Sequence, residues 1–403
     1  MHRRYYVPFF VIPCLLAATL LNAQAQDSKD SPEVKPVQYK PLNNAKYDNA
    51  GDFSEGLAPV RINDKWGFID RTGKMVIAPQ FNPWQEQFNA YFSEGLVAIN
   101  LTSAKVQGKE GNDARGTRWG FADKTGKIVI PAKFEGDYYA PPHFSDGLAV
   151  IGGTFIGTTI ATFGVHNKFG YIDKTGTLVI PQKYDEAYDF FEGMASVRIG
   201  EKYGFIDKTG KLVIAAMYDS PSYFKDGVAV VELNKLSFVI DKNNKKVFDQ
   251  GYLHLGTFYE GLARFEVDGR IGFIDSKGNV KIKPAFEYGS PESIRLMYFS
   301  EGLCHFEEVN DAARNNRNLF YGRYGYINKD GKVIIPAQFN YAGPFKNGIA
   351  VVSMNGNYGY INKTGKFIIP PIFANAGYFI DGIARVSGGG SFGDYKYRFI
   401  KLN

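Results

Sequence analysis

The sequence predicts an all-β protein, built as a tandem array of about nine three-stranded antiparallel β repeats. Three observations support this fold class. The 403 residues are 15% aromatic and include 45 glycines, a composition typical of many short strands joined by tight turns. A motif around Glu-Gly or Asp-Gly returns nine times along the chain. A second motif, followed by a turn signal, alternates with the first, and such self-similarity indicates a repeat architecture.

The first motif has the form Phe-x-Glu/Asp-Gly-aliphatic-Ala. The copy that begins at Phe191 has one residue fewer between Phe and Gly. The copies begin at Phe53, Phe92, Phe144, Phe191, Phe224, Phe258, Phe299, Phe345 and Phe379.

The second motif has the form aromatic-Gly-aromatic-Ile-Asp/Asn. Copies without insertions are 34 residues apart, as between Gly170 and Gly204. Because side chains alternate along a strand, the two aromatic residues of a copy share one face. The Gly between them permits a neighbouring backbone or ring to approach closely. Two readings of the aromatics remain open, a packed core and an exposed row that stacks on sugars, and their regular placement favours the core. Phe238 and Arg398 replace the Gly in two degenerate copies.

A turn signal follows the second motif in eight copies, as in Asp70-Arg-Thr-Gly73. Asp or Asn opens a type I turn through its own backbone, and the fourth position needs the positive φ that Gly or Asn adopts. Phe or Tyr stands eight residues after each of these turns, for example Phe81, and a Pro precedes most of them. Each unit is therefore predicted as strand, strand, hairpin turn, strand and an aromatic corner.

These motifs resemble the WG-repeat (KWG-type) family of bacterial proteins, whose signature is close to Lys-Trp-Gly-Phe-Ile-Asp-Lys-Thr-Gly-Lys. Residues 65–74 match it with one change, Arg71 for Lys, and residues 202–211 match it except for Tyr203. The resemblance covers roughly residues 47–401. It implies a β-rich repeat scaffold in bacterial, often exported, proteins, and it supplies no catalytic residues to transfer.

Two architectures fit units of about 34 residues, which must stack to bury their faces. The favoured expectation is an open, solenoid-like or superhelical array, and the alternative is β-propeller-like closure. The units are shorter than usual propeller blades, nine exceeds the usual blade number, and insertions interrupt the period.

The N-terminal region predicts export. Residues 1–25 are expected to form a signal peptide, with Arg3 and Arg4 before an apolar stretch and Ala23-Gln24-Ala25 as the cleavage site. Residues 26–46 are expected to be a flexible lead-in, and residues 47–403 the repeat domain. No later segment approaches 18 continuous apolar residues, so no transmembrane segment is expected after cleavage. The expected location is the periplasm, the cell surface or the medium.

The sequence offers no catalytic, cofactor-binding or metal site. Its histidines form no i, i+4 pair or Cys/His cluster, and no phosphate-binding loop or nucleophile elbow stands in its required context. The net charge of +6 is scattered, which argues against a nucleic-acid partner. Cys304, the one cysteine left after cleavage, is expected to be a buried small hydrophobe. The protein is therefore expected not to be an enzyme and to need no cofactor.

Three insertions separate the first motif from the second, at residues 100–116, 152–166 and 307–321. Loops on a rigid scaffold commonly carry binding, so these segments are candidate contacts for a partner. The predicted function is a non-catalytic scaffold that binds another protein. The alternative is a module that binds carbohydrate or cell-wall glycan through exposed aromatics, for which Trp84, Tyr138, Tyr139 and Tyr298 are the candidates.

Overall fold

The computed structural model describes residues 39–81, 91–100, 118–135, 141–152, 168–288, 294, 297–309, 322–388 and 396–402. The predicted signal peptide lies outside these residues, as does the predicted lead-in up to residue 38. The last part of that lead-in is described, and residues 39–41 form a strand.

All named elements are strands, and they form nine small antiparallel sheets of three or four strands each. We call these sheets blades 1 to 9. In chain order they contain β2 (Asn49–Ala50), β3 (Leu57–Ile62), β4 (Lys65–Asp70) and β5 (Met75–Phe81); β6 (Leu96–Asn100), β7 (Arg118–Asp123) and β8 (Ile128–Glu135); β9 (Phe144–Ser145), β10 (Leu148–Gly152), β11 (Phe169–Asp173) and β12 (Leu178–Tyr184); β13 (Glu186–Phe191), β14 (Met194–Ile199), β15 (Lys202–Asp207) and β16 (Leu212–Tyr218); β17 (Phe224–Lys225), β18 (Val228–Leu233) and β19 (Leu236–Asp241); β20 (Leu262–Val267), β21 (Arg270–Asp275) and β22 (Val280–Phe286); β23 (Leu303–Val309), β24 (Gly322–Asn328) and β25 (Val333–Phe339); β26 (Tyr341–Ala342), β27 (Ile349–Met354), β28 (Asn357–Asn362) and β29 (Phe367–Phe373); and β30 (Asn375–Ala376), β31 (Ile383–Ser387) and β32 (Tyr397–Leu402) with β1 (Tyr39–Pro41).

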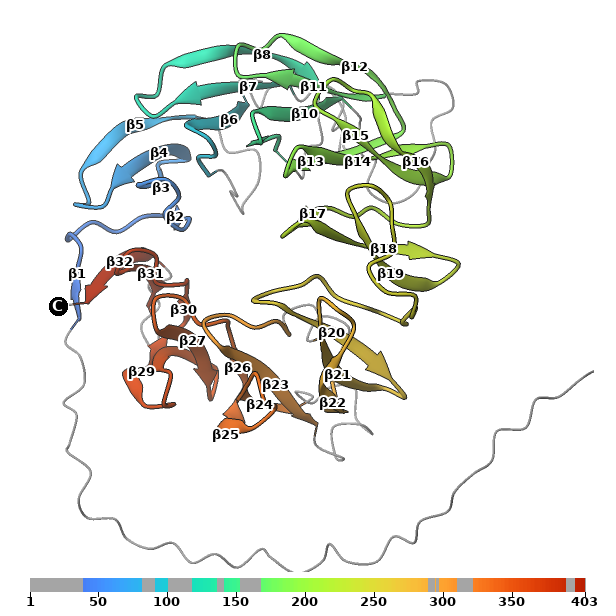
Figure 1. Ribbon diagram of the computed structural model, residues 1–403. Coiled ribbons are helices and arrows are strands. Elements are labelled where there is room, and N and C mark those ends of the chain that lie inside the picture. Colours follow the sequence, from blue (N-terminus) through green and yellow to red (C-terminus); the bar gives the residue numbers. More distant parts are fainter. Residues whose placement is uncertain are drawn as a thin grey trace, which may run out of the picture. The chain divides into compact units, whose positions relative to one another are not determined.

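Each blade is a meander whose strands pair in chain order, except that β1 pairs with β32 in blade 9. The blades follow one another around a ring, with inner strands such as β2, β13 and β17 toward the centre and β5, β12 and β16 at the rim (Figure 1). The structure is therefore a nine-bladed β-propeller.

The N-terminal strand closes this ring. β1 pairs antiparallel with β32 and supplies the outer strand of blade 9, in the register Tyr39 to Leu402 and Pro41 to Ile400. On the other side of the junction, Phe53 of blade 1 packs against Phe399 of blade 9, with ring centroids 5.2 Å apart. The predicted open array is wrong, and the propeller alternative is the correct one.

An inner strand that the sequence analysis did not predict explains why units of this length close into a ring. The first motif forms a two-residue hairpin that adds a short inner strand or bridge to the three predicted strands. In blade 1, Ser54 and Leu57 exchange backbone hydrogen bonds around Glu55 (φ 48°) and Gly56 (φ 89°), both in the left-handed region. This geometry matches the right-handed twist of the flanking strands, so two residues suffice for the connection.

The fourth copy of the first motif was misaligned in the sequence prediction. Phe191 is exposed, whereas Phe190 is completely buried and pairs with Ala195 across the hairpin. The motif therefore begins at Phe190 and lacks no residue. Two adjacent phenylalanines hide this register, and only burial distinguishes them.

The Gly of the second motif lies where the outer strand crosses the third strand. A Cβ on Gly120 would stand 2.5 Å from the carbonyl oxygen of Ile130 and 2.6 Å from the nitrogen of Ala132. The outer strand is bulged at this point, since Trp119 pairs with Phe134 and Phe121 pairs with Ile130. The predicted close approach of a backbone is confirmed.

Blade 5 shows what happens without this Gly. Phe238 stands in its place, and the blade has no regular outer strand. Residues 246–252 reach β19 only through isolated contacts, such as the bridge between Ser237 and Tyr252. The Phe238 ring lies against this segment, since Lys246 Nζ is 3.7 Å from the centre of the ring and a Cβ on Gly251 would stand 2.9 Å from a carbon of that ring.

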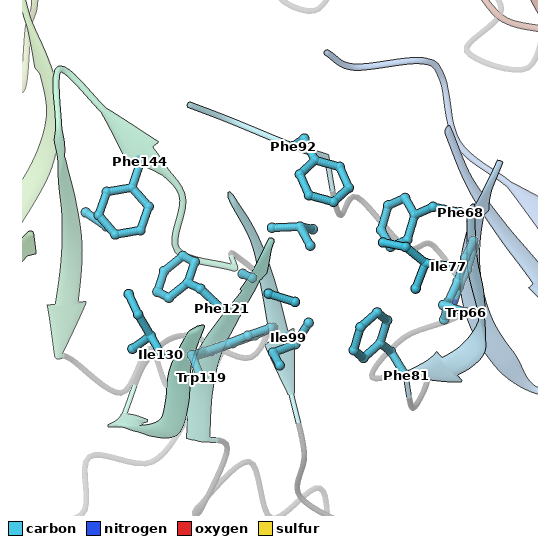
Figure 2. Close-up of a cluster of buried hydrophobic side chains, with 14 of the residues drawn as sticks. Trp66, Phe68, Ile77, Phe81, Phe92, Ile99, Trp119, Phe121, Ile130 and Phe144 are labelled. Carbon is cyan, nitrogen blue, oxygen red and sulfur yellow. The ribbon is translucent and has the colours of Figure 1, made fainter. Parts of the chain in front are cut away.

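The core lies between the blades. The second aromatic of the second motif packs against the buried Phe of the first motif in the next blade, with ring centroids 4.6 to 5.2 Å apart. Figure 2 shows two successive contacts, Phe68 with Phe92 and Phe121 with Phe144. The full set is Phe68–Phe92, Phe121–Phe144, Tyr171–Phe190, Phe205–Phe224, Phe273–Phe299, Tyr326–Phe345, Tyr360–Phe379 and Phe399–Phe53. Between blades 5 and 6, Val239 and Phe258 belong to one buried cluster.

Replacing Gly120 by Ala is expected to detach the outer strand of blade 2, since the new methyl group overlaps backbone that cannot move aside. We expect a loss of about 3 kcal/mol in the free energy of unfolding, measured by denaturant titration. Gly95→Ala in the same blade is the matched control. Its Cβ would meet nothing within 4 Å, so only the φ of +87° is unfavourable, at about 1 kcal/mol. Equal losses in the two variants would contradict the proposed overlap.

Removal of β1 is expected to open the ring. A chain that begins at residue 42 leaves the edge of β32 unpaired, whereas a chain that begins at residue 39 keeps the pairing. We expect a lower Tm for the shorter chain and a larger radius of gyration by small-angle X-ray scattering. Identical values for the two chains would show that β1 does not hold the ring closed.

Candidate functional site

One face of the ring carries the turns of the first motif together with the Asp-x-x-Gly turns that join the third and outer strands. The acidic residue of the first motif pairs with the Lys of the Asp-Lys-Thr-Gly turn in the next blade, as Glu55 does with Lys124 at 3.1 Å. The same pairing joins Glu94–Lys174, Asp146–Lys208, Glu192–Lys242, Glu260–Lys329 and Glu301–Lys363. Arg71, the one departure from the family signature in its copy, pairs with Asp381 and so joins blade 9 to blade 1.

These carboxylates also bind backbone. Gly95 donates its N–H to Glu55 across the blade junction at 2.9 Å. Burial acts to raise the pKa of Glu55, but the Lys124 ammonium and the N–H groups of the next turn outweigh it and hold the pKa below its usual value. Two junctions between the described blades have no such ion pair. Ser276 stands in place of the Lys that would face Asp226, and Asn347 stands in place of the acidic residue in blade 8. The repeated charges of this turn face therefore join blades.

The opposite face carries the insertions. The three segments lie between the second and third strands of blades 2, 3 and 7, and the ends of β6, β10 and β23 place them all on this face. The segments themselves lie outside the described residues, except that Asn100, Gly152 and residues 307–309 belong to the ends of β6, β10 and β23. In blade 8 the same connection is the two-residue turn Asn355-Gly356, with φ of 52° and 81°. The prediction that the insertions share one edge is confirmed by their flanking strands.

The inner strands present a second variable surface, which we call the inner wall. It consists of the residues on either side of the buried Phe of the first motif. The residue before the Phe is Asp52, Tyr91, His143, Asp189, Tyr223, Thr257, Tyr298, Pro344 or Tyr378. The residue after it is Ser54, Ser93, Ser145, Phe191, Lys225, Tyr259, Ser300, Lys346 or Ile380. The Ser found after the Phe in four blades donates a hydrogen bond to the carbonyl oxygen of the Phe in the next blade, as Ser54 does to Phe92 at 2.5 Å. No single residue type stands at either position in all nine blades, so most of the inner wall is free to vary.

Four aromatic residues form a continuous row on the inner wall across blades 4 to 7. The rings of Phe191 and Tyr223 lie 5.1 Å apart, and those of Tyr259 and Tyr298 lie 4.5 Å apart at 30°. The hydroxyls of Tyr223 and Tyr259 are 3.5 Å apart, which joins the two pairs. The Nζ of Lys225 lies 3.3 Å from the centre of the Tyr259 ring. This arrangement offers both apolar faces and hydrogen-bonding groups to a ligand.

Two further tyrosines and a lysine lie together across blades 8 and 9. The hydroxyls of Tyr341 and Tyr378 are 3.4 Å apart, and Lys346 lies over the Tyr378 ring at 4.4 Å. Burial raises the pKa of Tyr298 and of Tyr378, so both remain neutral hydroxyls at physiological pH. At the junction with blade 1, Arg385 binds Asp52 at 3.2 Å.

Blades 2 to 4 contribute a titratable group to the inner wall. His143 Nε2 lies 2.9 Å from Asp189, and its ring lies 5.4 Å from that of Tyr91. The hydrogen bond to Asp189 raises the pKa of His143 above its usual 6.5, although burial acts in the opposite direction. Three consecutive blades are thus linked by one charge pair and one ring contact.

The other predicted residues fall into two groups. Trp66 and Trp119 are completely buried, which confirms the packed-core reading for these two aromatics, and Cys304 is also buried. Tyr298 belongs to the inner wall, whereas Trp84, Tyr138 and Tyr139 lie outside the described residues. Within the described residues no group of three or more His, Cys, Asp or Glu could hold a metal ion. The inner wall was not predicted from the sequence. Aligning the nine copies on their buried Phe would have shown the variable residues on either side of it.

The sequence profile of the "WG containing repeat" family matches the chain eight times, at residues 44–66, 66–82, 119–151, 169–203, 203–236, 271–304, 324–358 and 358–390. These matches cover more than half of the chain. The protein belongs to the WG containing repeat family. The first match begins at residue 44, before β2, and the last match ends at residue 390, before β32.

Solved structures resemble this WG-repeat chain in fold only. A structure described as "the eukaryotic initiation factor" aligns with a TM-score of 0.50 and 11% identity, covering 82% of this chain and 88% of that chain. Hsv2p of Kluyveromyces lactis aligns with a TM-score of 0.35 and 8% identity, covering 65% of this chain and 96% of that chain. Among curated proteins no relative of the WG-repeat chain is found. Among the described residues, no helix is long and apolar enough to cross a membrane.

The His143–Asp189 pair makes stability depend on pH. Because the pKa of His143 is higher in the folded chain, the pair contributes fully below the usual pKa of 6.5, and its contribution is lost as the pH rises through the raised pKa. We therefore expect the Tm of the native chain to fall relative to that of His143→Gln as the pH rises through this window. Thermal unfolding at a series of pH values measures the difference. Parallel Tm curves for the two proteins would contradict the prediction.

Proposed function

We propose that this protein is a non-catalytic ring scaffold that binds another protein through its insertion face and inner wall. The single observation that carries the proposal is the asymmetry of the two faces. The turn face consists of short turns whose charged groups already join the blades, whereas all three long insertions emerge on the other face. Loops displayed on a rigid scaffold are the usual seat of recognition.

The inner wall supports a protein partner over a sugar. Tyr provides rigid, amphipathic contact area and is enriched at protein interfaces. The rings of Tyr259 and Tyr298 stack against each other, and Lys225 covers one face of Tyr259, so few faces remain for a sugar ring. Glycan binding is the second candidate, favoured by the exposure of Tyr91 and Phe191, 43% and 40%.

We further propose that the protein acts in the bacterial envelope or outside the cell. The features of residues 1–25, a basic start, an apolar stretch and a small-residue cleavage site, support export. Membership of the WG containing repeat family accords with a repeat scaffold and brings no catalytic motif to this chain.

The test replaces the insertions by the turn that the protein itself uses in blade 8. Residues 102–117, 154–167 and 310–321 are each replaced by Asn-Gly, singly and together, and the purified proteins are used to capture material from the native envelope fraction. Bound protein and bound polysaccharide are both quantified. We expect one enriched protein whose capture falls roughly tenfold or more in at least one variant, with an unchanged Tm. Lys124→Ala, on the turn face, is the matched control and should capture normally.

Two outcomes would contradict the proposal. Capture of polysaccharide without protein would favour the glycan alternative. Unchanged capture by the triple replacement would place binding elsewhere on the ring.

A further inference from the structure

The outer strands of a ring of blades are exposed edges with unpaired backbone groups. Natural proteins protect such edges with Pro, which cannot donate a hydrogen bond. Every regular outer strand in the described part of the chain contains a Pro except β16, where Ala215 and Ala216 stand instead. The protective prolines are Pro41, Pro79, Pro131, Pro181, Pro284, Pro336 and Pro370.

The bulge common to the outer strands does not explain this difference. β16 pairs with β15 in the same irregular register as the other outer strands, with Tyr203 opposite Tyr218 and Phe205 opposite Ile214. The backbone of blade 4 therefore has the shape that accepts Pro in blades 2, 3, 7 and 8. The Ala at position 215 leaves an N–H on the edge that those blades lack.

The rim next to β16 is also apolar. Leu212, Val213 and Met217 are exposed on β16 itself. The neighbouring blade 5 has no regular outer strand, and Val247 and Leu253 are exposed there. The apolar surface of the rim therefore continues from β16 onto blade 5.

The sequence of β16 is complementary to itself. Residues 211–219 read Lys-Leu-Val-Ile-Ala-Ala-Met-Tyr-Asp. When two copies are paired antiparallel about Ala215, Lys211 of each faces Asp219 of the other, and exposed Val213 faces exposed Met217. Lys211 is exposed, and Asp219, which binds Lys202 of its own blade, remains partly exposed. Opposite charges directly across an antiparallel pair are stabilising.

We propose that two copies of this protein associate through their β16 edges, in antiparallel register about a two-fold axis at Ala215. A contact between identical patches is the usual form of a closed dimer. The same fold already accepts strand addition at a sheet edge, since β1 joins β32 in this way. The contact lies on the rim and is independent of the insertion face.

The test is the substitution Ala215→Pro, which installs the residue found at the same place in blades 2, 3, 7 and 8. The mass of the full chain is measured by sedimentation equilibrium from micromolar to near-millimolar concentration. We expect the native mass to approach that of a dimer with increasing concentration. Ala215→Pro should weaken the dimer roughly tenfold or more without lowering the Tm.

A charge reversal provides an independent variant. Lys211→Glu places like charges opposite each other at both ends of the paired strands and is also expected to weaken the dimer. Lys127→Glu, at the equivalent position of blade 2, is the matched control and should not. A native chain that stays monomeric at all concentrations would overturn the proposal. The β16 edge would then be a candidate for pairing with a strand of another protein. A dimer unaffected by Ala215→Pro would overturn it equally.

Discussion

The contact on which the structure depends is the aromatic pair between successive blades. Each blade except blade 5, where Val239 takes this place, provides one ring from its third strand and one from its inner strand, and these rings meet partners in two different neighbours. No blade can bury both rings alone, and an open array would expose one ring at each end. Burying a Phe or Tyr side chain contributes on the order of 2 kcal/mol, so unpaired ends would be unfavourable. Closure, through Phe399 and Phe53, removes both ends at once.

The closing junction repeats the chemistry of the other junctions with different parts of the chain. β1 takes the place of an outer strand, and Asn43 donates a hydrogen bond to the carbonyl oxygen of Gly73 at 2.8 Å. In five other blades the Gly of this turn packs against an Ile side chain instead. Arg71 takes the place of Lys toward Asp381. The N-terminal segment and the final copy are therefore irregular because they complete one blade together. Arg398, which removes the Gly in that copy, is compatible with β1 because this short strand pairs in a regular register without a bulge.

Much of the fold followed from local chemistry in the sequence. The turns, the paired aromatics and the Gly at the strand crossing are each fixed by residues close together in the chain. Closure did not follow, because it depends on how blade 9 meets β1, which are separated by more than three hundred residues. The fourth strand was hidden by its length of two residues or a single bridge. The insertions were recognisable as departures from the period, whereas inner-wall residues such as Tyr223 and Tyr259 occupy positions that hold different residue types in different blades.

Comparing equivalent positions in the nine blades distinguishes the residues that the ring needs from the residues that are available for recognition. The buried Phe and the hairpin Gly return in every blade, and the paired rings and the blade-joining charges in most of them, because the ring needs them. Where these residues change, a local structural change accompanies them, as with Phe238 and the lost outer strand. The aromatic row on the inner wall and the missing Pro of β16 are different, since neighbouring blades adopt the same backbone with other residues. Residues that the backbone does not require are free to be selected by a partner, so these two surfaces carry the individuality of this ring.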